Sequence, residues 1–259
     1  MTYVDSIILG ILQGLTEFLP VSSSGHLTLV EQLLGHKDVP LLYDIIFHVA
    51  SLLAVLIYFR KKVGSLAKGV LSFNKWNEDH QYFTMLFVSS LVTGALVFVN
   101  KPILDILRER PLFLSFAFLF TAILLFTAQW FLKKKFEKKE ISLFDAIFIG
   151  FFQGIAVLPG VSRSGSTITA ALFRKISAND AVEYSFMLAI PAIIGALLFE
   201  LLKGSLGGID PVTASIGFAA SFVTSMAALK FLVFMIKRTV LYPFGIYLLI
   251  LAGVIPFLV

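Results

Sequence analysis

The sequence predicts an all-α polytopic membrane protein, built as a single integral domain over residues 1–259. Hydrophobic residues make up 58% of the chain, the mean hydropathy is +0.92, and only 14% of residues are charged. A soluble domain carries about 25% charged residues. The basic residues stand in short clusters between apolar runs, which is typical of membrane-flanking loops rather than of a nucleic-acid groove. We therefore expect membrane lipids, and no nucleic acid, as partners.

Six apolar stretches approach the roughly 20 residues that cross a bilayer core of about 30 Å. We do not expect the first twelve residues to be a cleaved signal peptide, because they lack Lys and Arg and contain Asp5. The chain has no cysteine, which excludes disulfide scaffolds and thiolate catalysis. The expected spans are 44–59, 84–99, 112–132, 181–202, 212–235 and 240–259.

Two further apolar regions, 4–34 and 143–173, are interrupted by polar, Gly- and Pro-containing runs. Broken backbone at membrane depth is tolerated only where it lines a cavity or is buried in protein. Each region therefore predicts a re-entrant hairpin of two short helices that enters and leaves on one side of the membrane.

The two interrupted regions repeat one pattern at a shift of 140 residues, which indicates an internal duplication. We predict a first repeat over 1–132 and a second over 141–259, each with one hairpin and three transmembrane helices. Because three spans are an odd number, the second repeat should be inverted relative to the first. The matching pairs include Asp5 and Asp145, Gly10 and Gly150, Gln13 and Gln153, Ser22 and Ser162, and Gly25 and Gly165.

The distribution of basic residues predicts the orientation of the chain. Fourteen Lys and Arg residues lie in one set of expected loops, whereas five lie in the opposite set. The positive-inside rule places the first set in the cytoplasm, so both termini lie outside and the first hairpin enters from the outer face. The first set comprises the loops 60–82, 133–141, 174–180 and 236–239.

The first hairpin contains an acid and a histidine around its break. Gln13 and Glu17 are four residues apart and share a helix face, and Pro20 ends the helix. A carboxylate within the membrane costs about 2.5–3.5 kcal/mol, so Glu17 is a functional candidate. Taken alone, Glu17 could simply reach water at the membrane interface. Taken alone, His26 could simply pack between helices. Their joint position around Ser22-Ser23-Ser24-Gly25 favours a catalytic role.

The second hairpin contains Arg163 in the middle of an apolar region. The guanidinium presents a planar fork of donors that suits phosphate, and it stays charged at any working pH. The alternative, that Arg163 belongs to a basic cytoplasmic loop, fits less well because the residues on both sides of this motif are apolar. Ser162, Ser164 and Thr167 add hydroxyl donors, and Gly165 lets the backbone approach closely. The helix that starts near Ser164 would direct free N–H groups to the same place. Together with Arg163 these groups predict an oxyanion cradle.

An acid–imidazole pair opposite an anion clamp suits phosphoryl transfer, which depends on positioning and charge stabilisation. The apolar exterior points to a lipid phosphate. The two motifs, Glu17 to His26 and Pro159 to Gly165, resemble those of the bacitracin-resistance undecaprenyl-diphosphate phosphatases, and the resemblance covers essentially the whole chain.

The resemblance implies hydrolysis of a C55-type isoprenyl diphosphate to the monophosphate, which recycles the carrier lipid for cell-wall polysaccharide synthesis in the plasma membrane. It also implies an active site that opens to the outer face and a divalent cation, Mg or Ca. Many family members have a second glutamate where this chain has Gln13. Glu17, with Gln13 as a weaker ligand, is therefore the expected metal site. A homodimer is a further expectation for this chain.

The sequence leaves the attacking group open. It is a serine activated by His26, with Ser23 preferred, or His26 itself, or a water activated by Glu17. Arg163, Ser162, Ser164 and Thr167 are expected to bind phosphate oxygens, with Ser22, Ser24 and Gly165 as further substrate contacts.

Three other functions compete with this interpretation. The acid-phosphatase-like lipid phosphatases need a histidine after the Ser-Arg motif, and this chain has none beyond His80. A purely structural role leaves the buried charges without a purpose. A transporter or flippase of an anionic isoprenyl lipid or small anion remains the alternative, because inverted repeats with broken helices are also transporter architecture.

Overall fold

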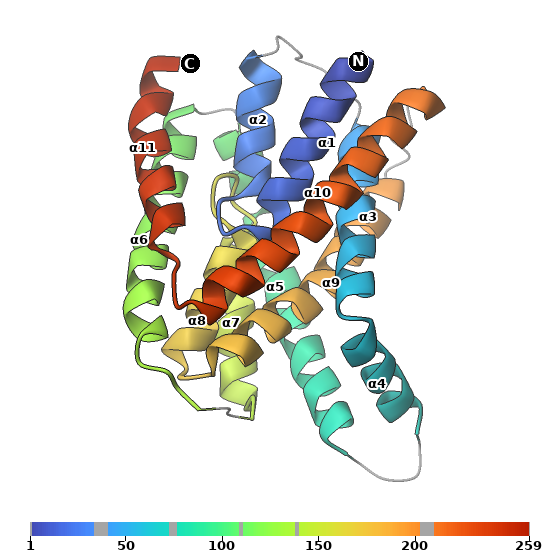
Figure 1. Ribbon diagram of the computed structural model, residues 1–259, viewed down its shortest axis with the longest axis vertical. Helices are drawn as coiled ribbons and strands as arrows, with labels where there is room; N and C mark the ends of the chain where they lie inside the picture. Colours follow the sequence, from blue (N-terminus) through green and yellow to red (C-terminus); the bar gives the residue numbers. More distant parts are fainter. Residues whose placement is uncertain are drawn as a thin grey trace.

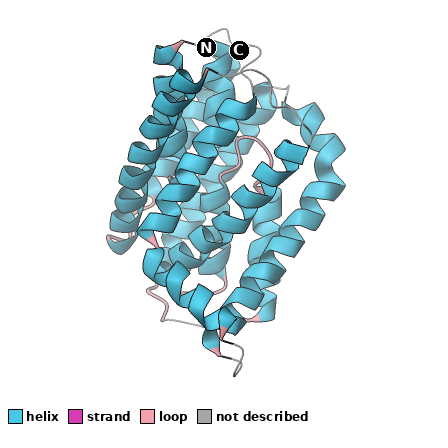
Figure 2. Cartoon of the chain, turned by 90° about the vertical axis from the view of Figure 1, so that its right-hand side faces the viewer, coloured by secondary structure: helices cyan, strands magenta, loops and turns pink. Residues whose placement is uncertain are grey.

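Every regular element that the described residues form is an α-helix (Figures 1 and 2). The structure is a computed structural model, and it describes residues 2–33, 41–72, 77–108, 111–137, 140–202 and 210–258. The helices are α1 (Tyr3–Phe18), α2 (Ser23–Leu33), α3 (Leu41–Tyr58), α4 (Arg60–Leu71), α5 (Glu78–Arg108), α6 (Pro111–Leu132), α7 (Leu143–Ile155), α8 (Arg163–Phe173), α9 (Ala178–Leu202), α10 (Pro211–Lys237) and α11 (Tyr242–Leu258).

Each of the six expected spans falls on a helix, which confirms the polytopic membrane fold. Within the described part of the chain, α5, α6, α9 and α10 contain stretches long and apolar enough to cross a membrane. Helix α3 meets that criterion only together with α4, to which it is joined at an angle of 80°. Helix α11 is apolar but has only 17 residues.

The expected loop 60–82 is partly wrong, because its first half forms the helix α4. Val63, Leu66 and Val70 recur at helical spacing, and Leu66 is buried against the core. Phe73 to Trp76, and the counted basic residues Lys37, Arg110, Lys138, Lys139 and Lys203, lie outside the described residues.

Both expected hairpins are present as pairs of short helices, α1 with α2 and α7 with α8. Figure 1 shows the first pair in the upper half of the molecule and the second in the lower half, with their breaks near mid-height. Matching capping boxes start α1 and α7: Thr2 with Asp5, and Ser142 with Asp145. The first helix of each hairpin therefore begins with the same local structure at the shift of 140 residues.

Each hairpin is held by a long helix of the other half of the chain. Helix α1 packs on α10, where a Cβ at Gly10 would come within 2.4 Å of the Gly217 carbonyl oxygen. Helix α7 packs on α5, where a Cβ at Gly150 would come within 2.5 Å of the Ser89 carbonyl oxygen. Glycine is required at both positions because the helix backbones approach too closely for a side chain.

Candidate active site

The two helix breaks meet in the interior of the molecule. Ser164 Oγ of the second break donates to the Leu19 carbonyl of the first at 3.2 Å. A Cβ at Gly25 would lie 2.9 Å from Gly160 Cα, so these two backbones are in direct contact. The break between α7 and α8 passes this point with Gly160 at φ +87°, a conformation that glycine adopts readily.

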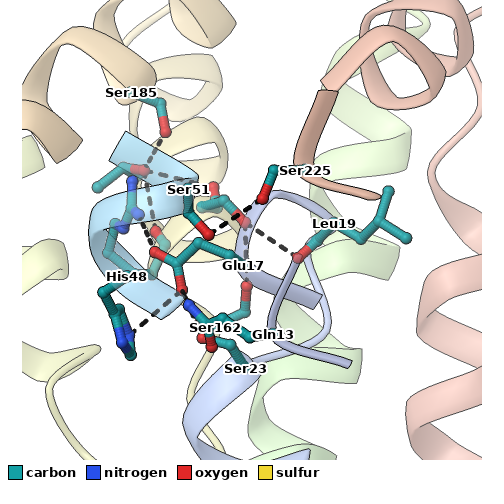
Figure 3. A network of polar contacts seen from close by, with 12 residues as sticks. Gln13, Glu17, Leu19, Ser23, His48, Ser51, Ser162, Ser185 and Ser225 are labelled. Carbon is teal, nitrogen blue, oxygen red and sulfur yellow. Dashed lines mark hydrogen bonds and ion pairs between the residues drawn. The ribbon is translucent and has the colours of Figure 1, made fainter. Parts of the chain in front are cut away.

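Glu17 is the centre of a buried polar cluster where the breaks meet (Figure 3). Its side chain is 7% exposed. Arg163 Nη2 lies 2.5 Å from Glu17 Oε1, and Ser23 Oγ donates to Oε2 at 2.6 Å. Gln13, one helical turn earlier, donates its Nε2 to the same Oε2 at 3.1 Å. The acid and the guanidinium therefore lie face to face, as the hairpin pattern predicts.

Two helix N-termini aim at this cluster, because Ser23 and Arg163 are the first residues of α2 and α8. Ser162 caps α8, and its Oγ accepts from the Gly165 N–H at 3.0 Å. Ser22 makes the matching contact to the Gly25 N–H at 3.4 Å. Free N–H groups at helix starts favour anions, so the cluster is suited to bind a phosphate.

His26 lies outside the hydrogen bonds around Glu17. Its Nδ1 lies 2.7 Å from the Ser22 carbonyl and its Nε2 lies 2.7 Å from the Tyr247 hydroxyl. The acceptor beside Ser23 in this structure is thus Glu17, not His26. Ser23 and His26 are still three residues apart on α2, so they share a helix face.

The remaining predicted substrate contacts differ in how accessible they are. Ser24 is exposed, whereas Ser162, Ser164 and Thr167 are almost fully buried. Thr167 donates to the Arg163 carbonyl at 2.9 Å and pairs with the Ser185 hydroxyl. In this structure the buried hydroxyls hold the second break in shape, and their contact with substrate stays a prediction.

His48 and Tyr247 are two site neighbours that the sequence did not single out. His48 Nε2, on α3, lies 3.7 Å from Glu17 Oε2. A histidine near the start of the apolar run 44–59 was the available signal for it. Tyr247 lies on α11, and no motif around it indicates that it reaches His26.

Two buried atoms of the cluster have no hydrogen-bond partner among the described residues: Arg163 Nη1 and Gln13 Oε1. A buried unpaired donor on a guanidinium fits an incoming phosphate oxygen. The Gln13 oxygen beside the Glu17 carboxylate fits a hard cation that takes oxygen ligands. Within the described ranges no group of three or more His, Asp or Glu residues is placed to hold a metal. Mg²⁺ is, however, often held by one or two carboxylates together with substrate phosphates.

Known proteins match this chain over nearly its whole length. The family of the bacitracin resistance protein BacA matches residues 6–254. Proteins named undecaprenyl-diphosphatase from Christiangramia forsetii and Treponema denticola are 38% and 37% identical to this chain. These alignments cover 95% and 96% of this chain and 94% of each relative. A protein from Halalkalibacterium halodurans named undecaprenyl-diphosphatase 2 is 33% identical over 265 residues. Because the family match and these relatives span nearly the whole sequence, the chain belongs to the bacitracin resistance protein BacA family.

Proposed function

We propose that this protein hydrolyses undecaprenyl diphosphate to the monophosphate and phosphate. The observation that carries the proposal is the buried Glu17 carboxylate with Ser23 on one oxygen and Arg163 on the other, at two helix starts. This cluster combines a hydroxyl nucleophile, a proton acceptor and an anion clamp within one hydrogen-bonded unit.

In the proposed reaction Ser23 Oγ attacks the terminal phosphorus and its proton passes to Glu17 Oε2, 2.6 Å away. The bond between that phosphorus and the bridging oxygen breaks, and the lipid monophosphate leaves. Arg163 keeps Nη2 on Glu17 and turns the unpaired Nη1 to the phosphate. A water then attacks the phosphorus of the phosphoserine and its proton goes to His26. The bond between the phosphorus and Ser23 Oγ breaks, phosphate leaves, and Ser23 Oγ takes back the proton held by Glu17.

We also propose that Glu17 and Gln13 Oε1 hold a divalent cation, Mg or Ca, together with the diphosphate. The support is the unpaired Gln13 oxygen beside the carboxylate. The ion, when bound, offsets phosphate charge that the paired Glu17 and Arg163 leave uncompensated. Thermal unfolding of a Gln13→Glu variant, with and without the divalent cation, measures binding of the cation independently of turnover.

The opening of the site to the outer face of the plasma membrane is likewise a proposal. It is supported by the basic loops, which predict that the end of the molecule carrying both termini lies outside. Figures 1 and 2 place the two termini at the same end of the molecule. The first hairpin, which contains Ser23, approaches the cluster from that end (Figure 1).

The test is phosphate release from undecaprenyl diphosphate by detergent-solubilised protein, followed by mapping of trapped phosphoenzyme. We expect release, label on Ser23, and a loss of at least about a hundredfold in Ser23→Ala, because the attacking atom is removed. Ser65→Ala is the control, since that side chain is exposed on α4 and lies outside the Glu17 cluster.

Other outcomes would contradict parts of the proposal. Binding without release would favour the transporter or flippase. Label on His26, or no label with Ser23→Ala still active, would replace the serine by His26 or by a water.

A further inference from the structure

His26 is held on several sides by groups from different helices. It lies on α2 and is 5% exposed. The Phe118 ring of α6 meets the imidazole edge to face, with ring centroids 5.2 Å apart. The Tyr247 ring of α11 is stacked on it at 5.6 Å with only 13° between the planes. The orientation of the imidazole is therefore set by the chain and not by solvent.

The hydrogen bond at Nδ1 fixes which nitrogen carries the proton. Nδ1 lies 2.7 Å from the Ser22 carbonyl oxygen, which can only accept, so Nδ1 must be the donor. Ser22 has φ +72°, and its carbonyl also accepts the His26 backbone N–H at 3.3 Å. The left-handed turn at Ser22 thus aims one carbonyl at both donors of His26.

With the proton on Nδ1, the neutral ring has its single acceptor at Nε2. The Tyr247 hydroxyl lies 2.7 Å from Nε2 and donates to it. Tyr247 and His26 are 221 residues apart and come from the two ends of the chain. The hydroxyl occupies the one ring atom that could accept a proton during catalysis.

The position of Tyr247 argues against a purely packing role. Its side chain is 45% exposed, so ring burial contributes little there. Tyr242, on the same helix, is 50% exposed. Of these two similarly exposed tyrosines, Tyr247 is the one whose hydroxyl is bonded to the imidazole. In the second hairpin Ser166 takes the place of His26 at the shift of 140 residues, so the imidazole and its aromatic partner belong to one side of the duplication.

We propose that Tyr247 positions His26 and connects it to the hydrolytic water: its hydroxyl donates to Nε2 and so favours the Nδ1–H tautomer. When the water gives its proton to the phenol oxygen, the phenol proton passes to Nε2, so His26 is protonated and Tyr247 stays neutral. Helix α11 is then part of the catalytic unit, although no motif marks it. The catalytic consequence rests on the proposed function, in which His26 takes the proton of the hydrolytic water. The tautomer of His26 does not depend on the proposed function.

The kinetic test compares Tyr247→Phe with Tyr242→Phe. Phenylalanine keeps the stacked ring and removes only the hydroxyl. We expect Tyr247→Phe to lower kcat on the order of tenfold with KM within about twofold, because binding is untouched and the hydroxyl that passes the proton to Nε2 is lost. Tyr242→Phe should match the wild type in both parameters. A wild-type kcat in Tyr247→Phe would overturn the proposal.

The second readout is independent of turnover. In detergent-solubilised protein labelled with ¹⁵N-histidine, the His26 signals are those that disappear in His26→Gln. We expect Nδ1 to be protonated and Nε2 to be bare and hydrogen-bonded, with Nε2 shifted toward the value of a free acceptor in Tyr247→Phe. A protonated Nε2 in the wild type, or no change in Tyr247→Phe, would overturn the assignment. A wild type that releases no phosphate but shows the expected tautomer would instead count against the proposed function alone.

Discussion

Ser23 and Arg163 stand 140 residues apart, at the first positions of α2 and α8, and their side chains bind the two oxygens of one carboxylate. Ser23 Oγ donates to Glu17 Oε2 at 2.6 Å and Arg163 Nη2 to Oε1 at 2.5 Å. The duplicated hairpins thus supply unlike groups at equivalent positions. The position equivalent to Glu17 is Val157, so the second hairpin lacks an acid and Gln153 bonds to Thr93 instead.

Arg163→Lys should lower phosphate release by about a hundredfold or more while the protein stays folded. Lysine can keep a single ion pair with Glu17, but it cannot also place the second donor that Nη1 provides. Loss of one preorganised donor costs about 10²–10³ in kcat in other enzymes. Arg238→Lys is the control, because Arg238 is exposed at the end of α10. Near-normal turnover of Arg163→Lys would contradict the cradle.

Gln13→Glu should make folding depend on a divalent cation. Gln13 Nε2 donates to Glu17 Oε2 at 3.1 Å, and a glutamate there would set two carboxylates against each other. We expect the thermal unfolding midpoint to fall by several degrees in chelator and to recover when Mg or Ca is added, because a cation held by these residues would offset the repulsion between the two carboxylates.

Gln153→Glu is the matched control for that experiment. Gln153 is also buried, but its amide donates to Thr93 and no carboxylate stands beside it. Its loss of stability should not be restored by cations. The metal proposal fails if Gln13→Glu unfolds at the same temperature with and without cation.

The sequence was sufficient to predict the hairpins and the meeting of their polar groups. Pro20 and Pro159-Gly160 each stand in a polar run that interrupts an apolar region, and the shift of 140 residues is visible without coordinates. Because broken helices of inverted repeats meet near the midplane, the sequence predicts that Glu17 and Arg163 face each other, and their direct ion pair is a finding of the structure. Whether the second repeat is inverted remains a prediction.

The details that the sequence missed depend on side-chain direction. Whether Ser23 points to Glu17 or to His26 is decided by the turn at Ser22, whose φ of +72° no propensity predicts. Tyr247 reaches His26 through the packing of α11 beside α6. That packing has no signature in an apolar helix, because lipid-facing and buried positions carry similar residues.

Gly160→Ala should destabilise the protein and reduce activity together. Gly160 has φ +87°, which costs an alanine about 1–2 kcal/mol, and a Cβ there would lie 2.7 Å from that of Ala117. Because the backbone of Gly160 lies directly against Gly25, the strain would displace the breaks from each other. Gly195→Ala is the control, since no described atom lies within 4 Å of its added Cβ. It should be neutral or stabilising in thermal unfolding, and an equal loss in both variants would contradict the role of the turn.

The cysteine-free sequence allows a direct test of the predicted inversion. Ser65 on α4 and Ser215 near the start of α10 are both exposed, so each accepts a cysteine without burial of a thiol. Ser65 lies in a predicted cytoplasmic segment, and Ser215 lies near the predicted outer end. In intact cells a membrane-impermeant maleimide should label Ser215→Cys, and it should label Ser65→Cys only after permeabilisation. Labelling of both in intact cells, or the reverse order, would contradict the orientation and with it a site that opens to the outer face.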